Sequence, residues 1–241
     1  MNENTRIAVC CYAGDCFQVI NALGCYLHHE CPVVVLSPED SKADVRYPGV
    51  EQRFGGPRAY IGQPSLDRQR IHLNMLLDYP EEYFLIHDAD SVCLSPRIPG
   101  YLYAEPDFLW SNLVNDGIPE HQPAYPAGWP HIAFQPPYFL SRKTIKGLLA
   151  VADQVTANPT MPFIDHYMVQ LAMHANWPYR SFRDGVSCPI STDPQSAEVA
   201  INGVRQHGLI FIHSVKKLSD IQRLGGARAE FVKGHPVSVC A

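Results

Sequence analysis

The sequence lacks a long apolar run, a surplus of basic residues and a secretion signal. Its net charge is −5, so it has no basic footprint of the kind that extended nucleic-acid binding requires. No segment approaches the roughly 20 apolar residues of a membrane span, and the polar start at residues 1–6 lacks the regions of a signal peptide. We therefore expect a soluble, cytoplasmic protein with neither a membrane span nor a nucleic-acid partner.

Paired cysteine motifs are also missing. The eight cysteines stand at positions 10, 11, 16, 25, 31, 93, 188 and 240, without a C-x-x-C pair or a paired zinc spacing. Several lie in apolar segments, where a free thiol behaves as a small buried hydrophobe, so reduced thiols are expected. The 241 residues, 46% of them hydrophobic, suffice for a substantial core, and we expect one domain over residues 1–241.

Strands and helices are predicted to alternate at the start of the chain. Residues 6–12 and 32–36 are short apolar runs typical of buried strands, and residues 17–29 between them fit a helix. A strand, a helix and a strand in this order imply a parallel pair joined by a right-handed crossover. The expected fold class is therefore α/β, with a central, mostly parallel sheet flanked by helices.

Composition separates loops from regular elements in the rest of the chain. Residues 47–62 are rich in Gly, Pro and Arg and are predicted as a loop, in which Gly55 and Gly56 either admit a ligand closely or form a turn. Residues 96–137 are crowded with Pro and aromatic residues and are predicted to contain a binding wall. Strands are predicted within 83–94, 108–113, 131–140 and 209–212, and helices over 65–78, 144–158 and 162–176.

Two aspartates follow an apolar run that reads as a buried strand. Residues 83–94 are YFLIHDADSVCL, with Asp88 and Asp90 near the expected end of the strand. Side chains alternate along a strand, so both carboxylates are expected on one side, about 6.6 Å apart along the backbone. Such a pair beyond the carboxyl end of a strand suits Mg²⁺ or Mn²⁺, which could hold a substrate diphosphate. The alternative is a solvated turn with two acids.

A histidine and a lysine follow the last predicted strand. His213 comes directly after residues 209–212, and Lys216 stands three residues further on. If both strands end at one crevice, the imidazole of His213 completes the metal site and the ammonium of Lys216 neutralises phosphate oxygens. Alternatively, His213 is a hydrogen-bonded histidine of the core or surface.

Three blocks of the sequence, at residues 7–15, 66–94 and 211–216, resemble the GT-A fold glycosyltransferases. The chain is most similar to the small, metal-dependent glycogenin-like group, and it also resembles the small glycosyltransferases of large algal viruses. The resemblance implies a single, Rossmann-like GT-A domain that transfers a sugar from a nucleotide sugar, expected to be a UDP-sugar, to a hydroxyl group. The implied acceptor is a glycan or glycoprotein, and the implied compartment is the cytoplasm, that of the host if the protein is viral.

The same resemblance implies a cofactor and its ligands. Asp88, Asp90 and His213 would ligate Mn²⁺ or Mg²⁺, Asp88 would also contact the donor, and Lys216 would contact the diphosphate. After Lys216 the sequence departs from the glycogenin-like pattern, which continues with Gly and then Lys-Pro-Trp.

For the nucleotide and the sugar, the resemblance implies contacts earlier in the chain. The backbone near Tyr12, Ala13 and Gly14 would receive the uracil and ribose. Arg70, on the helix before the metal strand, would contact the donor sugar or phosphate. The alternative for Arg70 is a solvated helix charge.

These residue types suit the sugar transfer that the resemblance implies. Negative charge develops on the leaving diphosphate, where a divalent ion and Lys216 stabilise it. In an inverting route Asp165, at the predicted start of a helix, accepts the proton of the acceptor hydroxyl. In a retaining route, which the glycogenin-like resemblance favours, the departing phosphate takes that proton and Asp165 positions sugar hydroxyls. The alternative for Asp165 is capping of the helix.

Three other functions fit parts of the pattern. A haloacid dehalogenase-like phosphohydrolase uses an Asp-x-Asp pair as nucleophile and acid, but usually on its first strand, whereas two predicted strands precede the pair here. A nucleotidyltransferase would need a Gly-rich, basic phosphate loop that the opening strand lacks. A non-catalytic nucleotide-sugar-binding module could use the same residues without turnover.

Overall fold

The structure, a computed structural model, describes the backbone of residues 4–11, 23, 26, 31–41, 44–59, 62–93, 98–115, 132–156, 164–182, 187–189 and 211–213. Within these ranges, the structure describes the backbone but not the side chains of residues 92–93, 113–115, 132–135, 164–166, 187–189 and 211–213. The expectations for Tyr12, Ala13, Gly14 and Lys216 lie outside the described residues.

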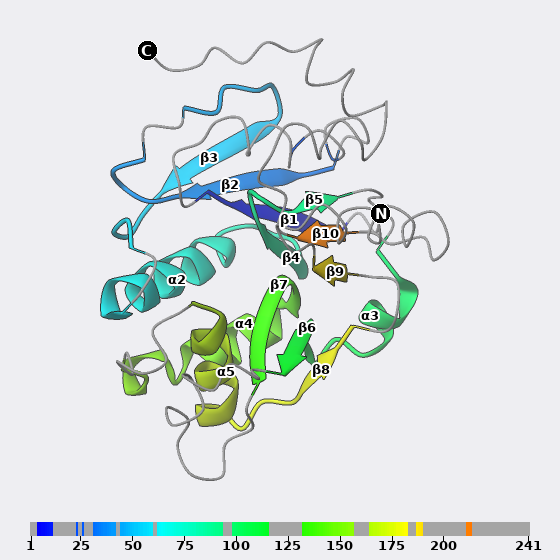
Figure 1. Ribbon diagram of the computed structural model, residues 1–241. Helices are drawn as coiled ribbons and strands as arrows, with labels where there is room; N and C mark the ends of the chain where they lie inside the picture. Colours follow the sequence, from blue (N-terminus) through cyan, green and yellow to red (C-terminus); the bar gives the residue numbers. More distant parts are fainter. Residues whose placement is uncertain are drawn as a thin grey trace.

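Seven strands form the main sheet, in the order β3-β2-β1-β4-β7-β6-β8 (Figure 1). They are β1 (Thr5–Cys10), β2 (Val33–Ser37), β3 (Val50–Phe54), β4 (Tyr83–Asp88), β6 (Leu109–Asn115), β7 (Ile132–Ser141) and β8 (Tyr179–Ser181). Every neighbouring pair is parallel except those of β7, which runs antiparallel to β4 and β6. The predicted α/β class and the mostly parallel sheet are confirmed, and the order β3-β2-β1-β4 is that of a Rossmann-like, doubly wound sheet.

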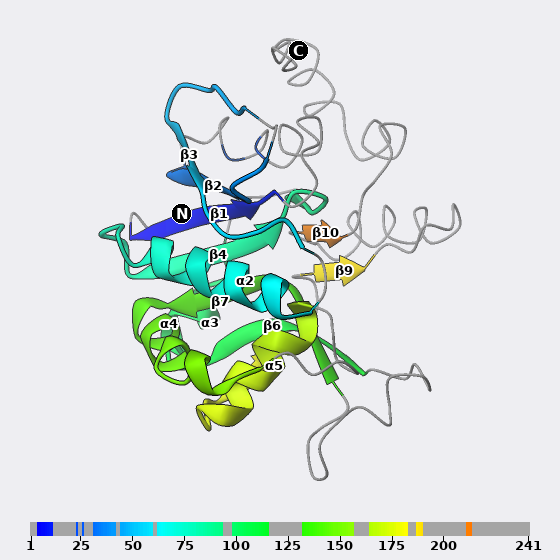
Figure 2. The ribbon, with the colours of Figure 1, turned by 90° about the vertical axis from the view of Figure 1, so that its left-hand side faces the viewer.

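Helices cover both faces of this sheet. One face packs against α2 (Gly62–Leu76), α4 (Arg142–Leu149) and α5 (Ile164–His174), while α3 (Gly100–Ala104) lies on the other face together with Leu23 and Tyr26, which have helical backbone (Figures 1 and 2). Because both faces are buried, the central strands are apolar at consecutive positions instead of alternating with polar residues. None of the helices that the structure describes is long and apolar enough to cross a bilayer.

A second, three-stranded sheet lies beyond the carboxyl ends of β1 and β4 (Figure 2). It consists of β5 (Val92–Cys93), β9 (Ser187–Pro189) and β10 (Phe211–His213), with β10 in the middle. β10 pairs antiparallel with β5 and parallel with β9. A segment from the last part of the chain therefore lies directly beside the continuation of β4.

Most predicted elements are confirmed, but one predicted loop and the end of one predicted helix were wrong. The segment 47–62, predicted as a loop, contains the strand β3. Its sequence, VEQRF, is mostly polar, as suits a strand at the edge of the sheet, whose one neighbour among the described strands is β2. The helix predicted over residues 144–158 ends at Leu149, and a short 3-10 turn (Ala152–Gln154) follows it. The buried side chains of Ala152 and Val155 hold that turn against the core.

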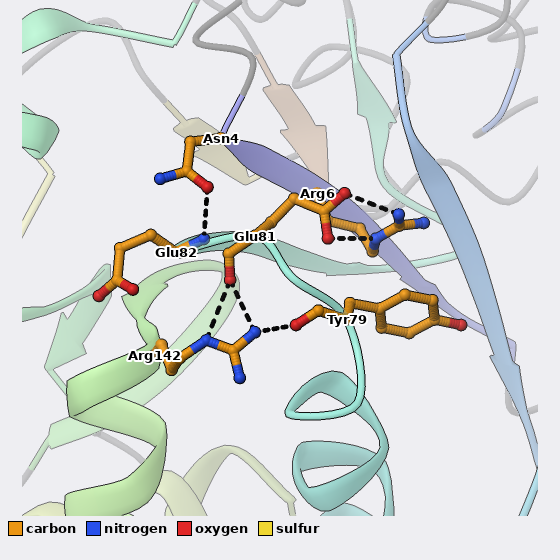
Figure 3. A network of polar contacts seen from close by, with 6 residues as sticks. All are labelled: Asn4, Arg6, Tyr79, Glu81, Glu82 and Arg142. Atoms are coloured by element: carbon orange, nitrogen blue, oxygen red, sulfur yellow. Dashed lines mark hydrogen bonds and ion pairs between the residues drawn. The ribbon is translucent and has the colours of Figure 1, made fainter.

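A polar network at the amino edge of the sheet fixes the connection between α2 and β4 (Figure 3). Arg6 of β1 donates two hydrogen bonds to the carboxylate of Glu81, at 3.0 and 2.7 Å, and its guanidinium lies 4.0 Å from the ring centroid of Tyr79. Arg142, the first residue of α4, donates to the carbonyl oxygens of Leu77, Tyr79 and Glu81. The start of β4 is therefore held from both β1 and α4.

We predict that Arg142→Met lowers the free energy of unfolding by about 2–4 kcal/mol, because three partly buried carbonyl groups lose a charged donor. Lys143→Met is the matched control: Lys143 is exposed and pairs with the exposed Asp107 at 2.8 Å, so its loss should cost less than about 1 kcal/mol. Denaturant unfolding with comparison of the m-values measures both. Equal losses in the two variants would contradict this role of Arg142.

A buried histidine on α2 makes the fold sensitive to acid. His72 is 1% exposed, and its Nε2 lies 3.1 Å from the carbonyl oxygen of Gly55. Burial, reinforced by the charge of Arg68, lowers the pKa of His72 from 6.5 to about 4. The ring of His72 is therefore neutral in the folded protein. In the unfolded chain the same ring takes up a proton below about pH 6.5. The free energy of unfolding is therefore unaffected by this residue above that pH and decreases as the pH falls from about 6.5 toward 4.

We predict that this one residue removes about 2 kcal/mol of stability between pH 7 and pH 5. His72→Gln keeps a polar side chain that does not titrate, so the variant should lose correspondingly less stability over the same interval. Unfolding by urea at pH 7, 6 and 5, in wild type and variant, gives the difference directly. A difference that is independent of pH would show that His72 is not held neutral by the fold.

Candidate functional site

The order in which the chain adds strands to the sheet reverses between β1 and β4. From β1 the chain proceeds to β2 and β3 on one side, and it then returns through α2 to β4 on the other side. The last residues of the two strands pair with each other, Cys10 with Asp88. In open α/β sheets the crevice at such a switch point is where ligands bind. Asp88 therefore ends its strand at the switch point, beside the end of β1.

Asp88 and Asp90 are joined by a tight turn and not by a continuing strand. The amide of Ala89 donates to the carbonyl oxygen of Cys10 at 2.9 Å, but the amide of Ser91 turns back to the carbonyl oxygen of Asp88 at 3.0 Å. The prediction that strand alternation applies to this pair was wrong, because β4 ends at Asp88 and residues 89–90 form a turn. Asp88 and Asp90 are both partly exposed, and one carboxylate oxygen of Asp90 is buried.

His213 belongs to the strand that pairs with the continuation of this turn. Ile212 of β10 is paired with Val92 of β5, and one further step of the antiparallel register brings the backbone of His213 beside Ser91. Two segments far apart in the chain therefore meet next to Asp88 and Asp90. The side chain of His213 is outside the described set, and among the side chains within it no group of three potential metal ligands occurs.

Asp165 lies at the same edge of the sheet. It is the second residue of α5, whose 11 residues span about 16 Å. The last turn of α5 leads to β8, where Tyr179 pairs with Leu109 at the start of β6, so this end of the helix lies at the amino edge. The first turn of α5 therefore points toward the carboxyl edge, although the orientation of the Asp165 side chain is outside the description.

Arg70 has acidic partners on the outer side of α2. Its guanidinium contacts Asp153 and lies 3.9 Å from Asp67, and 37% of its side chain is exposed. It is not among the buried residues of the helix, which face the sheet. Contact between Arg70 and a donor remains a prediction, whereas its ion pairs with Asp67 and Asp153 are part of the fold.

Gly55 and Gly56 pack closely against the neighbouring helix, α2. Gly56 has a φ of +75°, and a Cβ there would lie 2.7 Å from the Cα of Arg68 on α2. Arg68 is 1% exposed and donates to the carbonyl oxygen of Ala59 and to the hydroxyl of Ser65. Close packing against α2 therefore accounts for glycine at this position, and it ties the segment after β3 to the first turns of the helix.

Two residues beside the candidate site were not predicted. His87, the residue before Asp88, is fully buried, and its ring lies 2.7 Å from the hydroxyl of Tyr26 and 2.8 Å from the carbonyl oxygen of Asp88. The signal for His87 is present in the sequence, since it is a polar residue within the apolar run of β4. Nothing in the sequence indicates Tyr26, which is 61 residues away.

Comparison with protein-family models finds no family that matches the chain, and comparison with curated proteins finds no similar protein.

We predict different costs for alanine at two glycines that both have positive φ. Gly49, with a φ of +81°, has no atom within 4 Å of a built Cβ, so Gly49→Ala should cost about 1 kcal/mol of stability from backbone strain alone. Gly56→Ala adds a clash with the backbone of α2 and should cost about 3 kcal/mol. Thermal unfolding of both variants tests this. Equal costs would show that α2 moves away without penalty.

Proposed function

We propose that the protein is a glycosyltransferase of the GT-A type, which moves a sugar from a nucleoside diphosphate sugar to a hydroxyl group. The observation that carries the proposal is the position of Asp88 at the end of β4, in the switch point beside β1, with β10 paired to the strand that follows. A nucleotide bound across that crevice would have its diphosphate near Asp88 and Asp90.

The metal ligands proposed at this edge suit a divalent cation that prefers oxygen ligands. The carboxylates of Asp88 and Asp90 are hard ligands that suit Mn²⁺ or Mg²⁺, and the imidazole of His213 is the proposed third ligand. When bound, such an ion stabilises the negative charge that develops on a leaving diphosphate. The described side chains supply two of the three proposed ligands, since the side chain of His213 lies outside them.

The remaining proposed roles fall to Lys216, to Asp165 and to the backbone after β1. We assign Lys216 to the phosphate oxygens, where its fixed positive charge favours the leaving group. We assign to Asp165, near the start of α5, the role of accepting a proton or positioning sugar hydroxyls. The backbone at Tyr12, Ala13 and Gly14 follows β1 directly and would receive the base and ribose of the donor.

The proposed donor is a UDP-sugar, the proposed acceptor is a glycan or glycoprotein, and the proposed compartment is the cytoplasm. The glycogenin-like resemblance favours a retaining outcome. Of the alternatives, the phosphohydrolase is disfavoured because the described strands β1, β2 and β3 precede the one that ends at Asp88.

We predict that Mn²⁺ and UDP together raise the melting temperature of the protein, whereas either alone raises it less. At 100 times the dissociation constant, binding should add about 2.7 kcal/mol to the free energy of unfolding, which for a chain of this size is a rise of roughly 5–10 °C. Asp88→Asn and Asp90→Asn preserve side-chain shape but remove the charge, so both should abolish the joint effect.

Asp107→Asn is the control, because Asp107 is an exposed carboxylate that pairs with Lys143 in the connection before β6. It should retain the full shift. Absence of a joint shift in the wild type would refute the proposal. Release of phosphate from simple phosphomonoesters without nucleotide would instead favour the phosphohydrolase, and binding without transfer to any acceptor would favour the non-catalytic module.

A further inference from the structure

Two buried side chains form a chain of hydrogen bonds that ends on the backbone between the two aspartates. The hydroxyl of Tyr26 lies 2.7 Å from Nε2 of His87, and Nδ1 of His87 lies 2.8 Å from the carbonyl oxygen of Asp88. Both residues are 0% exposed. Tyr26 belongs to the segment between β1 and β2, which also contains the proposed nucleotide loop.

The direction of these hydrogen bonds follows from the chemistry of the groups. A carbonyl oxygen can only accept, so Nδ1 of His87 carries the hydrogen that is donated to Asp88. In a neutral imidazole Nε2 is then an acceptor, and the hydroxyl of Tyr26 is its donor. Both ring nitrogens of the buried His87 then have a hydrogen-bond partner, as buried polar groups generally do.

Three hydrogen bonds converge on the single peptide that links Asp88 to Ala89. Its carbonyl oxygen accepts from Nδ1 of His87 and from the amide of Ser91, at 2.8 and 3.0 Å, and its amide donates to Cys10 at 2.9 Å. The plane of this peptide sets the direction of the chain from Asp88 to Asp90. Rotation of the peptide would break all three hydrogen bonds and would change the position of Asp90 relative to Asp88.

We infer that Tyr26 and His87 are positioning residues that hold the Asp88–Ala89 peptide in place, so that the carboxylates of Asp88 and Asp90 are preorganised for one divalent cation. The inference rests on the proposed function, since it assumes that these two carboxylates bind the ion. Neither Tyr26 nor His87 touches the ion or the substrate. Their contribution lies in binding affinity, in the way that partners behind metal ligands support the ligands themselves.

A matched pair of tyrosine variants tests the inference. Tyr26→Phe removes the donor to His87 at the carboxyl end of β4, whereas Tyr103→Phe removes a hydroxyl that lies 3.0 Å from Thr5 at the amino end of β1. Each variant loses one hydroxyl and keeps the ring. We expect Tyr26→Phe to weaken Mn²⁺ binding about 10-fold or more, with less than a twofold change in Tyr103→Phe. The free Mn²⁺ signal in electron paramagnetic resonance, with UDP present, measures both.

Two variants of His87 separate positioning from packing. His87→Asn retains a donor close to the place of Nδ1 and should keep most of the Mn²⁺ affinity, whereas His87→Leu removes the donor and should lose at least as much as Tyr26→Phe. The melting temperature in the absence of metal reports the structural cost of each change. A structural role alone would lower the melting temperature and leave the Mn²⁺ affinity unchanged.

The outcomes distinguish the inference from the proposed function. If the wild-type protein does not bind Mn²⁺ with UDP, the proposed function fails first. If the wild type binds and Tyr26→Phe binds equally well, the proposed function stands and the inference is overturned. Equal losses in Tyr26→Phe and Tyr103→Phe would overturn it as well, because they would reflect general loosening of the sheet.

Discussion

β1 and β4 pair in parallel from Thr5 with Tyr83 to Cys10 with Asp88, and both the two buried faces and the candidate site follow from this pairing. It joins the β1–β2–β3 part of the sheet to the β7–β6–β8 part. Parallel pairing also brings the carboxyl ends of two strands to one edge, which a hairpin of the same strands would not do. In open α/β sheets, ligands bind beyond the carboxyl ends of such neighbouring strands.

The polar residues of β4 and its connections are concentrated at its two ends. At the amino edge Arg6, Glu81 and Arg142 hold the chain where it enters the strand. At the carboxyl edge His87 and Tyr26 hold it where it leaves. Between them Phe84, Leu85 and Ile86 are at most 3% exposed, so hydrophobic packing fixes the middle of the strand. Directed hydrogen bonds fix its ends, where packing alone would leave the backbone direction free.

Whether a strand could be predicted from the sequence depends on how far it is buried. β1, β2 and β4 could be predicted because strands covered on both faces are continuous apolar runs, and the carboxyl end of β4 could be predicted with them. β3 could not, because an edge strand tolerates the polar residues of VEQRF. The turn after Asp88 and the partnership of Tyr26 with His87 were also beyond prediction, since both depend on tertiary contacts between segments distant in sequence.

The pairing of β10 with β5 shows how binding and folding could support each other in the proposed function. The two strands share two paired positions, which is a small contribution against the entropy of closing so long a segment of chain. A cation held by Asp88, Asp90 and His213 would join the same two segments through a second set of contacts. Because ligand binding stabilises the state that binds it, metal and donor would then strengthen the small sheet as well as the site. The main sheet is held by its buried strands and by the polar contacts at its amino edge, which lie away from the proposed site.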